Sequence, residues 1–162
     1  MPIYMQVQGI DGDVSAKGYE KWIALDSLNF GANRDIKTRT GKTSDREATL
    51  PTVGEIVVTK EMNKSSPNLF AEACVGKAKS VTIHVCQTGT DDAKPYVEYT
   101  LNNVLLSNYQ VALDRNSDHA VPVETLNLNF DKIEMKYIPY DEQHNAGSPI
   151  PAGYDLTTGT KI

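Results

Sequence analysis

Apolar and polar residues alternate along most of this chain, and such a period of two is typical of strands with one buried face. In the stretch IYMQVQ, residues 3–8, Ile, Met and Val take every second position. Further extended stretches are predicted at Lys21–Ala32, which is ended by Gly31, at Glu55–Met62 and at Lys79–Val85. The chain is therefore predicted to be mainly β.

Two long strand-like segments change phase part-way along, Pro95–Leu113 at Asn102–Asn103 and Glu124–Ile138 at Asp131–Lys132. In the first segment the alternation breaks at that point and resumes less cleanly, and in the second the apolar residues move from one set of alternate positions to the other. A β-bulge inserts the one extra residue that produces such a switch, and it bends the strand. Two bent long strands favour a closed or nearly closed antiparallel β-barrel over a flat sheet.

One helix is predicted between the strands, in SSPNLFAEACVGK, residues 65–77. Ser66 suits the N-cap, Pro67 the first helical turn and Gly76 the C-terminal stop. Its apolar residues form a single stripe, which predicts a helix that lies on the barrel: Leu69, Phe70, Ala73 and Cys74. Cys74 is then expected to be a core thiol.

Two segments are expected to lie outside the barrel wall, a protruding loop at residues 33–52 and a C-terminal tail at residues 145–162. Irregular stretches of this length in a compact domain are usually functional or disordered. The loop is locally positive, with five basic and three acidic residues between Arg34 and Glu47. Its basic residues are Arg34, Lys37, Arg39, Lys42 and Arg46. A positive arm on an acidic body fits self-association, and the alternative is a solvated loop.

Composition and charge restrict the class of protein. The 162 residues fit a single domain, 1–162, with a real core. The net charge of −5 argues against nucleic acid and against an anionic membrane surface, both of which need concentrated Lys and Arg. No apolar run reaches the ~20 residues that span a bilayer, and the N-terminus lacks a signal-peptide pattern. The protein is therefore expected to be made in the cytoplasm and to leave it only by a route that needs no signal peptide.

Candidate catalytic and metal-binding patterns are weak. Gly41-Lys42-Thr43 resembles the end of a phosphate-binding loop, but the position that requires the first glycine is Ile36. His84 and Cys86 share a strand face and offer two metal ligands, whereas a zinc site needs three or four. No nucleophile elbow or thiol-protease turn occurs. The sequence predicts no enzyme and no cofactor, and it predicts that Cys74 and Cys86 are free thiols, with a disulfide as the alternative.

Five motifs follow one another along nearly the whole chain. The most specific is VTKEMNKSSPNLFAEACVGK, in which a Thr-Lys strand end precedes Lys-x-Ser-Pro-x-Leu and a helix that closes in Gly-Lys. The others are IYMQVQGIDGDV, PYVEYTLNNVLLSNYQV, ETLNLNFDKIEMKYIP and GSPIPAGYDLTT. Together they resemble the haemolysin-coregulated protein (Hcp) family, the tube subunit of bacterial type VI secretion.

This resemblance implies a structural protein that assembles. Members of the family are β-barrels with one flanking helix, and they form hexameric rings that stack into a tube inside a contractile sheath. A spike protein caps the tube, effector proteins ride in its lumen, and sheath contraction expels it, which accounts for secretion without a signal peptide. The implied partners are further copies of the chain, the spike, the sheath and effectors, with no cofactor, nucleic acid or membrane insertion.

The same resemblance implies roles for individual residues. By the family's topology Ser27 and Asn29 point into the ring lumen and contact effectors, and the alternative is a wall residue without a cargo role. The 33–52 loop is implied to reach a neighbouring ring, so that its basic residues are ring-stacking residues. Tyr154 and Asp155 are implied to belong to an inter-subunit tail.

Two functions of other classes remain open. A small-ligand-binding β-barrel carrier would be a monomer with an apolar interior pocket. A hydrolase that uses His84 would lose its activity on His84→Ala. A fused toxin domain is not expected, because the chain ends at Ile162, just beyond the tail motif.

Overall fold

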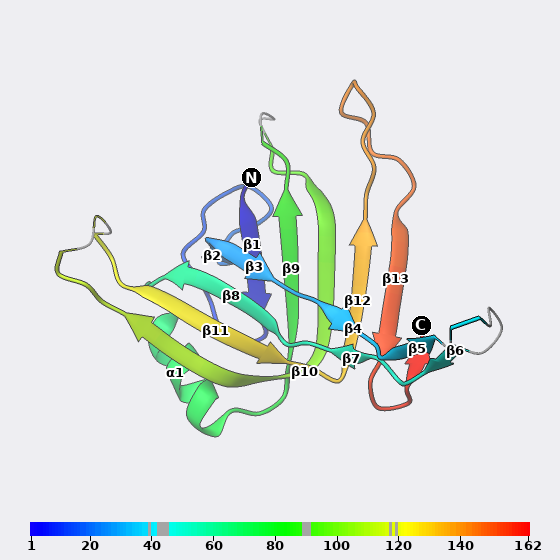
Figure 1. The fold of residues 1–162 in the computed structure, drawn as a ribbon. Coiled ribbons are helices and arrows are strands. Elements are labelled where there is room, and N and C mark those ends of the chain that lie inside the picture. Colours follow the sequence, from blue (N-terminus) through cyan, green and yellow to red (C-terminus); the bar gives the residue numbers. More distant parts are fainter. Residues whose placement is uncertain (39, 42–45, 89–91, 117, 119) are drawn as a thin grey trace.

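The computed structural model describes residues 1–162 except 39, 42–45, 89–91, 117 and 119. The described residues form one ten-stranded antiparallel sheet whose two branches share the long strand β10 (Pro95–Ala112). The first branch contains β1 (Ile3–Val7), β2 (Ile23–Leu25), β9 (Lys79–Cys86), β12 (Lys132–Tyr137), β13 (Ile150–Asp155) and β14 (Thr160–Lys161). The second contains β3 (Ser27–Asn29), β8 (Ile56–Glu61) and β11 (Val123–Asn129). Figure 1 shows the two branches crossing as two layers.

The core lies between these two layers. Alternate residues of each strand point inward and have no solvent exposure: Met5, Ile23, Ile83 and Leu101 from the first layer, and Ile56, Val58, Leu126 and Leu128 from the second. Burying each such side chain contributes about 1.5–3 kcal/mol. The predicted strands at Ile3–Gln8, Glu55–Met62 and Lys79–Val85 are confirmed as β1, β8 and β9.

The two predicted phase changes are confirmed as the point where the chain bends from one layer to the other. Before the bend, β10 pairs with β12 over Val97–Asn102, and after it with β11 over Leu105–Ala112. Asn103 has a left-handed φ of 51°, and its Nδ2 donates to Oδ2 of Asp131 at 2.5 Å. The two predicted phase changes, at Asn103 and at Asp131, therefore lie side by side at the bend.

The prediction of a closed barrel was wrong. The main path of the sheet runs from β14 to β3 and stays open, and β1 and β2 branch from it through β9. The chain crosses between the layers at Asp26, whose amide donates to the carbonyl of Thr59 at 2.7 Å. In the described part of the chain β2 pairs only with β1, and β3 only with β8. Each of these strands has three residues, which is too short to continue a ladder around the bend.

Helix α1 (Ser66–Val75) packs against β10 and ends before Gly76, as predicted. The helix begins one residue earlier than expected, because Ser65 takes the N-cap position and Ser66 is the first helical residue. Leu69 is fully buried, whereas Phe70 is 55% exposed and Cys74 is an exposed thiol. The prediction of a core thiol at Cys74 was therefore wrong, because the helix turns that part of the predicted stripe to solvent.

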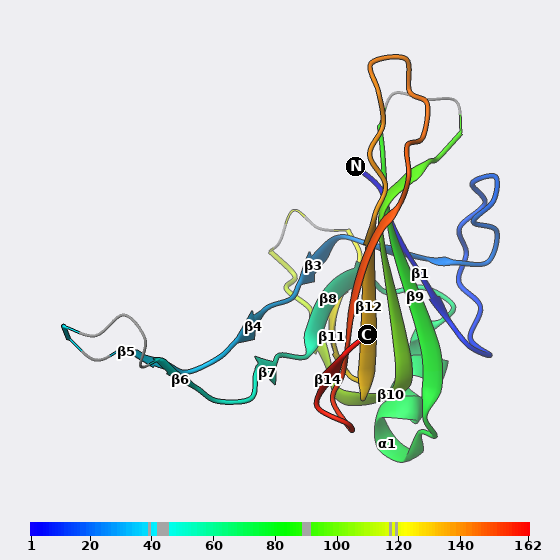
Figure 2. The same ribbon diagram turned by 90° about the vertical axis from the view of Figure 1, so that its right-hand side faces the viewer.

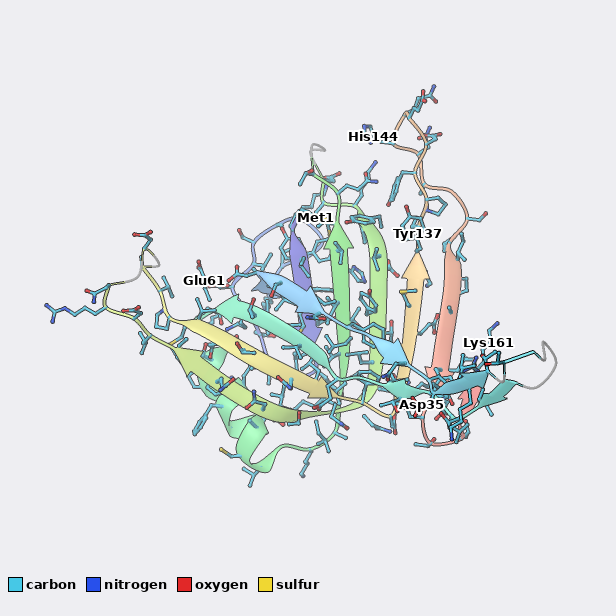
Figure 3. The ribbon with its side chains drawn as sticks, viewed as in Figure 1. Met1, Asp35, Glu61, Tyr137, His144 and Lys161 are labelled. Carbon is cyan, nitrogen blue, oxygen red and sulfur yellow. The ribbon has the colours of Figure 1, made fainter. Side chains whose placement is uncertain are left out.

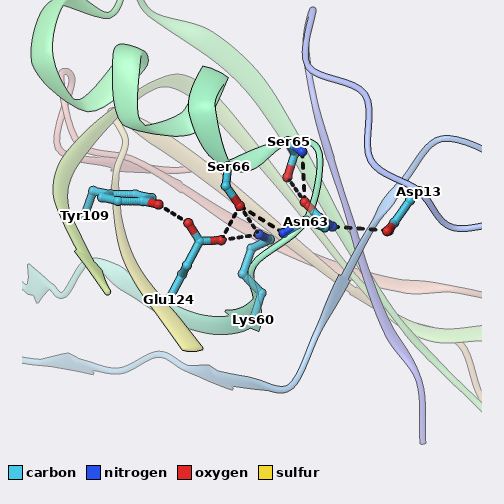
Figure 4. Close-up of polar contacts among 7 residues, drawn as sticks. All are labelled: Asp13, Lys60, Asn63, Ser65, Ser66, Tyr109 and Glu124. Atoms are coloured by element: carbon cyan, nitrogen blue, oxygen red, sulfur yellow. Dashed lines mark hydrogen bonds and ion pairs between the residues drawn. The ribbon is translucent and has the colours of Figure 1, made fainter. Parts of the chain in front are cut away.

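A polar network is buried where α1 begins (Figure 4). The carboxylate of Glu124 on β11 accepts bonds from Lys60 on β8 and Tyr109 on β10, and from the hydroxyl of Ser66 at 2.7 Å. Burial alone would raise the pKa of Glu124, but the bonds from Lys60, Tyr109 and Ser66 lower it below its ordinary value. Burial, followed by the hydrogen bond to this carboxylate, raises the pKa of Tyr109 to about 12. The network thus joins three strands to the helix.

The loop at 33–52 forms an arm that extends away from the two layers (Figure 2). Two short ladders stiffen the arm, β4 (Ala32–Asn33) with β7 (Thr52–Val53) and β5 (Ile36–Thr38) with β6 (Arg46–Ala48). The prediction that the C-terminal tail lies outside the wall was wrong. Its strand β13 pairs with β12 along six residues and extends the first layer.

Candidate assembly surfaces

The residues predicted to face a lumen lie on one exposed sheet surface. Leu28 of β3 packs on the core, so Ser27 and Asn29 on either side of it point outward and are exposed. The register places Ser27 opposite Thr59 on β8, with 2.5 Å between Oγ and Oγ1. Asn29 lies opposite Val57. The structure therefore brings the two predicted residues to the same face.

This face continues across β8, β11 and the second half of β10, and its further residues were missed by sequence reasoning. Hydroxyl and amide side chains take most of the outward positions, with Val57 among them on β8. We call the polar set the amide–hydroxyl face: Ser27, Asn29, Thr59, Asn108, Gln110, Thr125 and Asn127. Nδ2 of Asn108 lies 3.4 Å from Oδ1 of Asn127. Glu61 marks one end of β8, and the arm with Asp35 leaves from the other side (Figure 3). The polar positions in ETLNLN could have identified this face.

The arm carries the predicted ring-stacking residues. Arg34 and Lys37 are exposed, and Lys37 belongs to β5. The backbone of Arg46 pairs with Thr38 in the β5–β6 ladder. The other two predicted residues, Arg39 and Lys42, lie outside the described residues.

Part of the inner face of the first layer is not covered by the second layer. The side chains of Met135 and Tyr137 on β12 and Ile150 on β13 are largely exposed there. Beside them is a hollow of about 200 Å³, which we call the strand hollow. It is lined by Phe30, Ala32 and Val53 from the base of the arm and by Ile133, Met135, Ala152, Gly153 and Tyr154 from the sheet. Tyr154, predicted as a tail residue, thus lines an apolar surface.

Asp155, the other predicted tail residue, has a role within its own chain. Its Oδ1 accepts bonds from the hydroxyl of Thr157 at 2.6 Å and from the amide of Thr157 at 2.9 Å. These bonds, the hydroxyl bond first, lower the pKa of Asp155. The carboxylate therefore holds the turn between β13 and β14.

The outer face of the first layer holds the groups considered for metal binding and catalysis. The hydroxyl of Tyr19 shares a hydrogen bond with Nδ1 of His84 at 2.9 Å, and the rings of His84 and Trp22 lie 5.0 Å apart. Burial lowers the pKa of His84, and it raises the pKa of Cys86, whose side chain has no solvent exposure. A thiol with a raised pKa is a poor nucleophile. The described residues include no group of three His, Cys, Asp or Glu that could hold a metal ion, and Cys74 and Cys86 are free cysteines.

The space enclosed between α1 and the sheet bears on the carrier alternative. A cavity of about 10 Å³ lies there, lined by Val7, Val81, Val104 and Leu128 among others. It has room for about one water molecule. This cavity is too small to be the ligand cup that a carrier requires.

Comparison with known families identifies the chain. The model of the family described as "Type VI secretion system effector, Hcp" matches residues 4–137. The chain belongs to the Hcp family. Hcp proteins are structural proteins of the type VI secretion tube and are secreted by that system. A comparison with curated protein sequences found no match.

Solved structures agree with the Hcp fold. A structure described as a type six secretion system protein has a TM-score of 0.92 at 24% identity, with 99% of each chain covered. Hcp1 from Salmonella typhimurium has a TM-score of 0.80 at 20% identity, covering 99% of this chain and 98% of its own. A type VI secretion system effector from Yersinia pestis has a TM-score of 0.72 at 18% identity, covering 94% and 98%. At these identities the likenesses show the fold alone. Among the described residues of this Hcp protein, no helix is long and apolar enough to cross a membrane.

Proposed function

We propose that this Hcp protein is the structural subunit of a type VI secretion tube, and that it forms hexameric rings that stack and carry effector proteins. One observation supports this most directly: Met135, Tyr137 and Ile150 are 40%, 48% and 62% exposed on one uncovered sheet face. Contiguous apolar surface of this kind usually marks a protein interface. A neighbouring copy in a ring would cover it, with Tyr154 at the contact.

In this proposal the amide–hydroxyl face lines the lumen, with Ser27 and Asn29 among the residues that contact effectors. Each hydrogen bond exchanged with water contributes only about 0.5–1.5 kcal/mol net. A wall of neutral hydroxyl and amide groups would therefore hold a passenger protein weakly and release it. The alternative is that Asn29 is a wall residue without a cargo role, and it predicts that substitutions of Asn29 do not change the amount of bound effector.

The arm would reach the next ring and make the stacking contact. Arg34 and Lys37 are exposed on it, while the chain as a whole carries a net charge of −5. Opposite charges would therefore favour docking of the arm on the body of a neighbour. The spike at the tip, the surrounding sheath and effectors in the lumen complete the proposed set of partners, and export proceeds without a signal peptide.

The first test is the solution mass of the purified protein, measured by light scattering over a range of concentration and salt and followed by negative-stain imaging. A hexamer mass with annular particles is the expected result. A monomer under every condition would overturn the proposal and leave the family and fold intact.

A further inference from the structure

The connection between β1 and β2 folds over the outer face of the first layer. Residues 11–22, which we call the strap, lie on the side of this layer that faces away from the second layer (Figure 2). The backbone of the strap bonds to itself: the amide of Gly12 donates to the carbonyl of Lys21 at 2.7 Å, and the amide of Lys21 donates to the carbonyl of Val14 at 2.9 Å. The strap is therefore a compact unit outside the strand ladders, and such units can open locally.

Tyr19 anchors the strap to the sheet. Its side chain is only 5% exposed, and its ring packs on Tyr4 of β1 with 4.7 Å between the ring centroids. Its hydroxyl lies 2.9 Å from Nδ1 of His84 on β9. The ring of Trp22, at the end of the strap, lies 5.0 Å from the ring of His84. The strap thus rests on a cluster of aromatic rings centred on Tyr19 and His84.

The other attachments of the strap are weaker. Nδ2 of Asn63 donates to Oδ1 of Asp13 at 3.2 Å, and Nζ of Lys17 lies 3.8 Å from Oδ1 of Asp92. Both contacts are exposed, where such pairs contribute little. Lys21 has a left-handed φ of 67°, which costs energy in a residue with a side chain. The closed strap therefore depends on the contact between Tyr19 and His84.

The bond between Tyr19 and His84 requires a neutral imidazole. Nε2 of His84 faces Oε1 of Glu98 at 3.8 Å, which favours the tautomer with its hydrogen on Nε2 and leaves Nδ1 as an acceptor. Burial raises the pKa of Tyr19, so its hydroxyl keeps its proton and donates to Nδ1. A proton added at Nδ1 turns both ring nitrogens into donors, and the hydroxyl then loses its acceptor.

The surroundings of His84 also disfavour its charged form while the strap is closed. Burial lowers the pKa of His84; Glu98 opposes this effect, and Lys136, whose Nζ lies 3.9 Å from Oε2 of Glu98, adds to it. The other titratable groups on this face come from β1, the strap and β9: Tyr4, Tyr19 and Cys86. The charged residues of the strap are exposed: Asp11, Asp13, Lys17, Glu20 and Lys21. An open strap would return the imidazole to water, so the open form takes up a proton more readily and acid favours it.

We propose that the strap is a pH-sensitive latch, closed near neutral pH by the bond from Tyr19 to His84 and released when His84 gains a proton. Release detaches residues 11–22 from the outer face and uncovers the rings of Tyr4 and His84. The two layers stay folded, because the core lies between them and not beneath the strap. This inference does not rest on the proposed function, since it concerns a single chain.

Proteolysis of the folded protein tests the latch. A glutamate-specific endoprotease that is active in mild acid should cut after Glu20 when the strap opens. Glu142, on an exposed loop elsewhere, gives a reference rate in the same sample. Between about pH 7.5 and about pH 5.5 the rate of cleavage after Glu20, relative to Glu142, should rise about tenfold, because uptake of one proton shifts the open-to-closed ratio by up to tenfold per pH unit below the ordinary pKa.

Variants separate the latch from a general effect of acid. His84→Gln keeps an acceptor for Tyr19 but cannot gain a proton, so its relative rate should not change with pH. Tyr19→Phe keeps the ring and loses the hydroxyl, so its strap should be cut rapidly at neutral pH as well. Tyr99→Phe is the matched control: it removes a hydroxyl that packs against the core and should behave like the natural chain. Urea midpoints establish that all three variants are folded.

Cleavage after Glu98, within β10, reports unfolding of the sheet and should be absent at both pH values. Cleavage after Glu20 that rises in acid, is independent of pH in His84→Gln and is rapid in Tyr19→Phe supports the latch. A relative rate that stays constant with pH in the natural chain, or an equal rise in His84→Gln, would overturn it. So would a Tyr19→Phe strap cut as slowly as the natural one, or cleavage after Glu98 that accompanies cleavage after Glu20.

Discussion

Lys60 and Glu124 are cross-strand partners on β8 and β11 that form an ion pair without any solvent exposure. A buried pair of this kind persists only when its remaining hydrogen-bonding positions are also satisfied. Ser66 and Tyr109 supply those bonds, so the first residue of α1 is tied to the second layer of the sheet. The pair thus determines where the helix sits on the sheet.

Removing one partner should leave an uncompensated buried charge. Lys60→Met is expected to lower the free energy of unfolding by about 3–5 kcal/mol, measured by urea denaturation at neutral pH. The double variant Lys60→Met with Glu124→Leu should recover most of that loss, because no charge remains buried. An equal loss in the single and double variants would contradict this account.

The bend between the two layers depends on the left-handed backbone of Asn103. Asn103→Val should lower the free energy of unfolding by roughly 1–2 kcal/mol because a β-branched residue is strained at positive φ, and it also removes the bond to Asp131. Asn103→Gly loses the same bond but adopts this φ without strain, so it should be the more stable of the two variants. Equal urea midpoints for the valine and glycine variants would show that the φ angle carries no strain.

The pH dependence of stability should include a contribution from His84. Tyr19 and Trp22 contact it, Glu98 lies 3.8 Å from its Nε2, and Lys136 lies beyond Glu98. Burial lowers the pKa of His84 below its ordinary value of 6.5, so its stabilising contribution is complete above pH 6.5 and is lost as pH falls through the lowered pKa.

The fluorescence of Trp22, the single tryptophan of the chain, should report this loss during urea unfolding at a series of pH values. In His84→Gln the stability should fall less between pH 6.5 and acid than in the natural chain. The pH dependence of the free energy of unfolding that remains in that variant is the contribution of the carboxyl groups. If the free energy of unfolding changed equally with pH in the two proteins, His84 would make no contribution.

Stacking through the arm should depend on charge and on salt. Reversing three basic residues at once, Lys37→Glu with Arg39→Glu and Lys42→Glu, is expected to abolish tube formation while single rings persist, as seen by negative stain. Salt screens exposed charges over about 8–10 Å, so tubes of the natural chain should shorten as ionic strength rises. Tubes of normal length from the triple variant would eliminate the electrostatic role of the arm.

Cargo retention should respond to a charge introduced on the amide–hydroxyl face. Asn29→Arg combined with Asn127→Arg should leave ring formation intact and should change the amount of a co-expressed effector that co-purifies, because the wall is then no longer neutral. Ser15→Arg, on an exposed loop, is the matched control. Unchanged retention in the double variant would favour a wall without a cargo role.

Local pattern was a reliable guide to the strands and to the bend. The alternation in β1, β8 and β9 and the phase changes at Asn103 and Asp131 follow from side-chain direction within a strand, which neighbouring residues alone determine. The family motif in residues 58–77 was equally local. By contrast, the sequence pattern predicts that Cys74 and Phe70 are buried residues of an amphipathic helix. They are exposed because of the way α1 lies on β10, which the pattern does not determine.

The sequence by itself determined that this protein is mainly β, that a helix ends just before Gly76, and that it belongs among the Hcp proteins, because periodicity and motifs are properties of short stretches. The tertiary structure alone decided that the sheet is open, that the tail supplies β13, and that Lys60 meets Glu124 across 64 positions of sequence. Each of these depends on which strand lies beside which. That choice is made by the free energy of the whole packed core, and no local pattern encodes it.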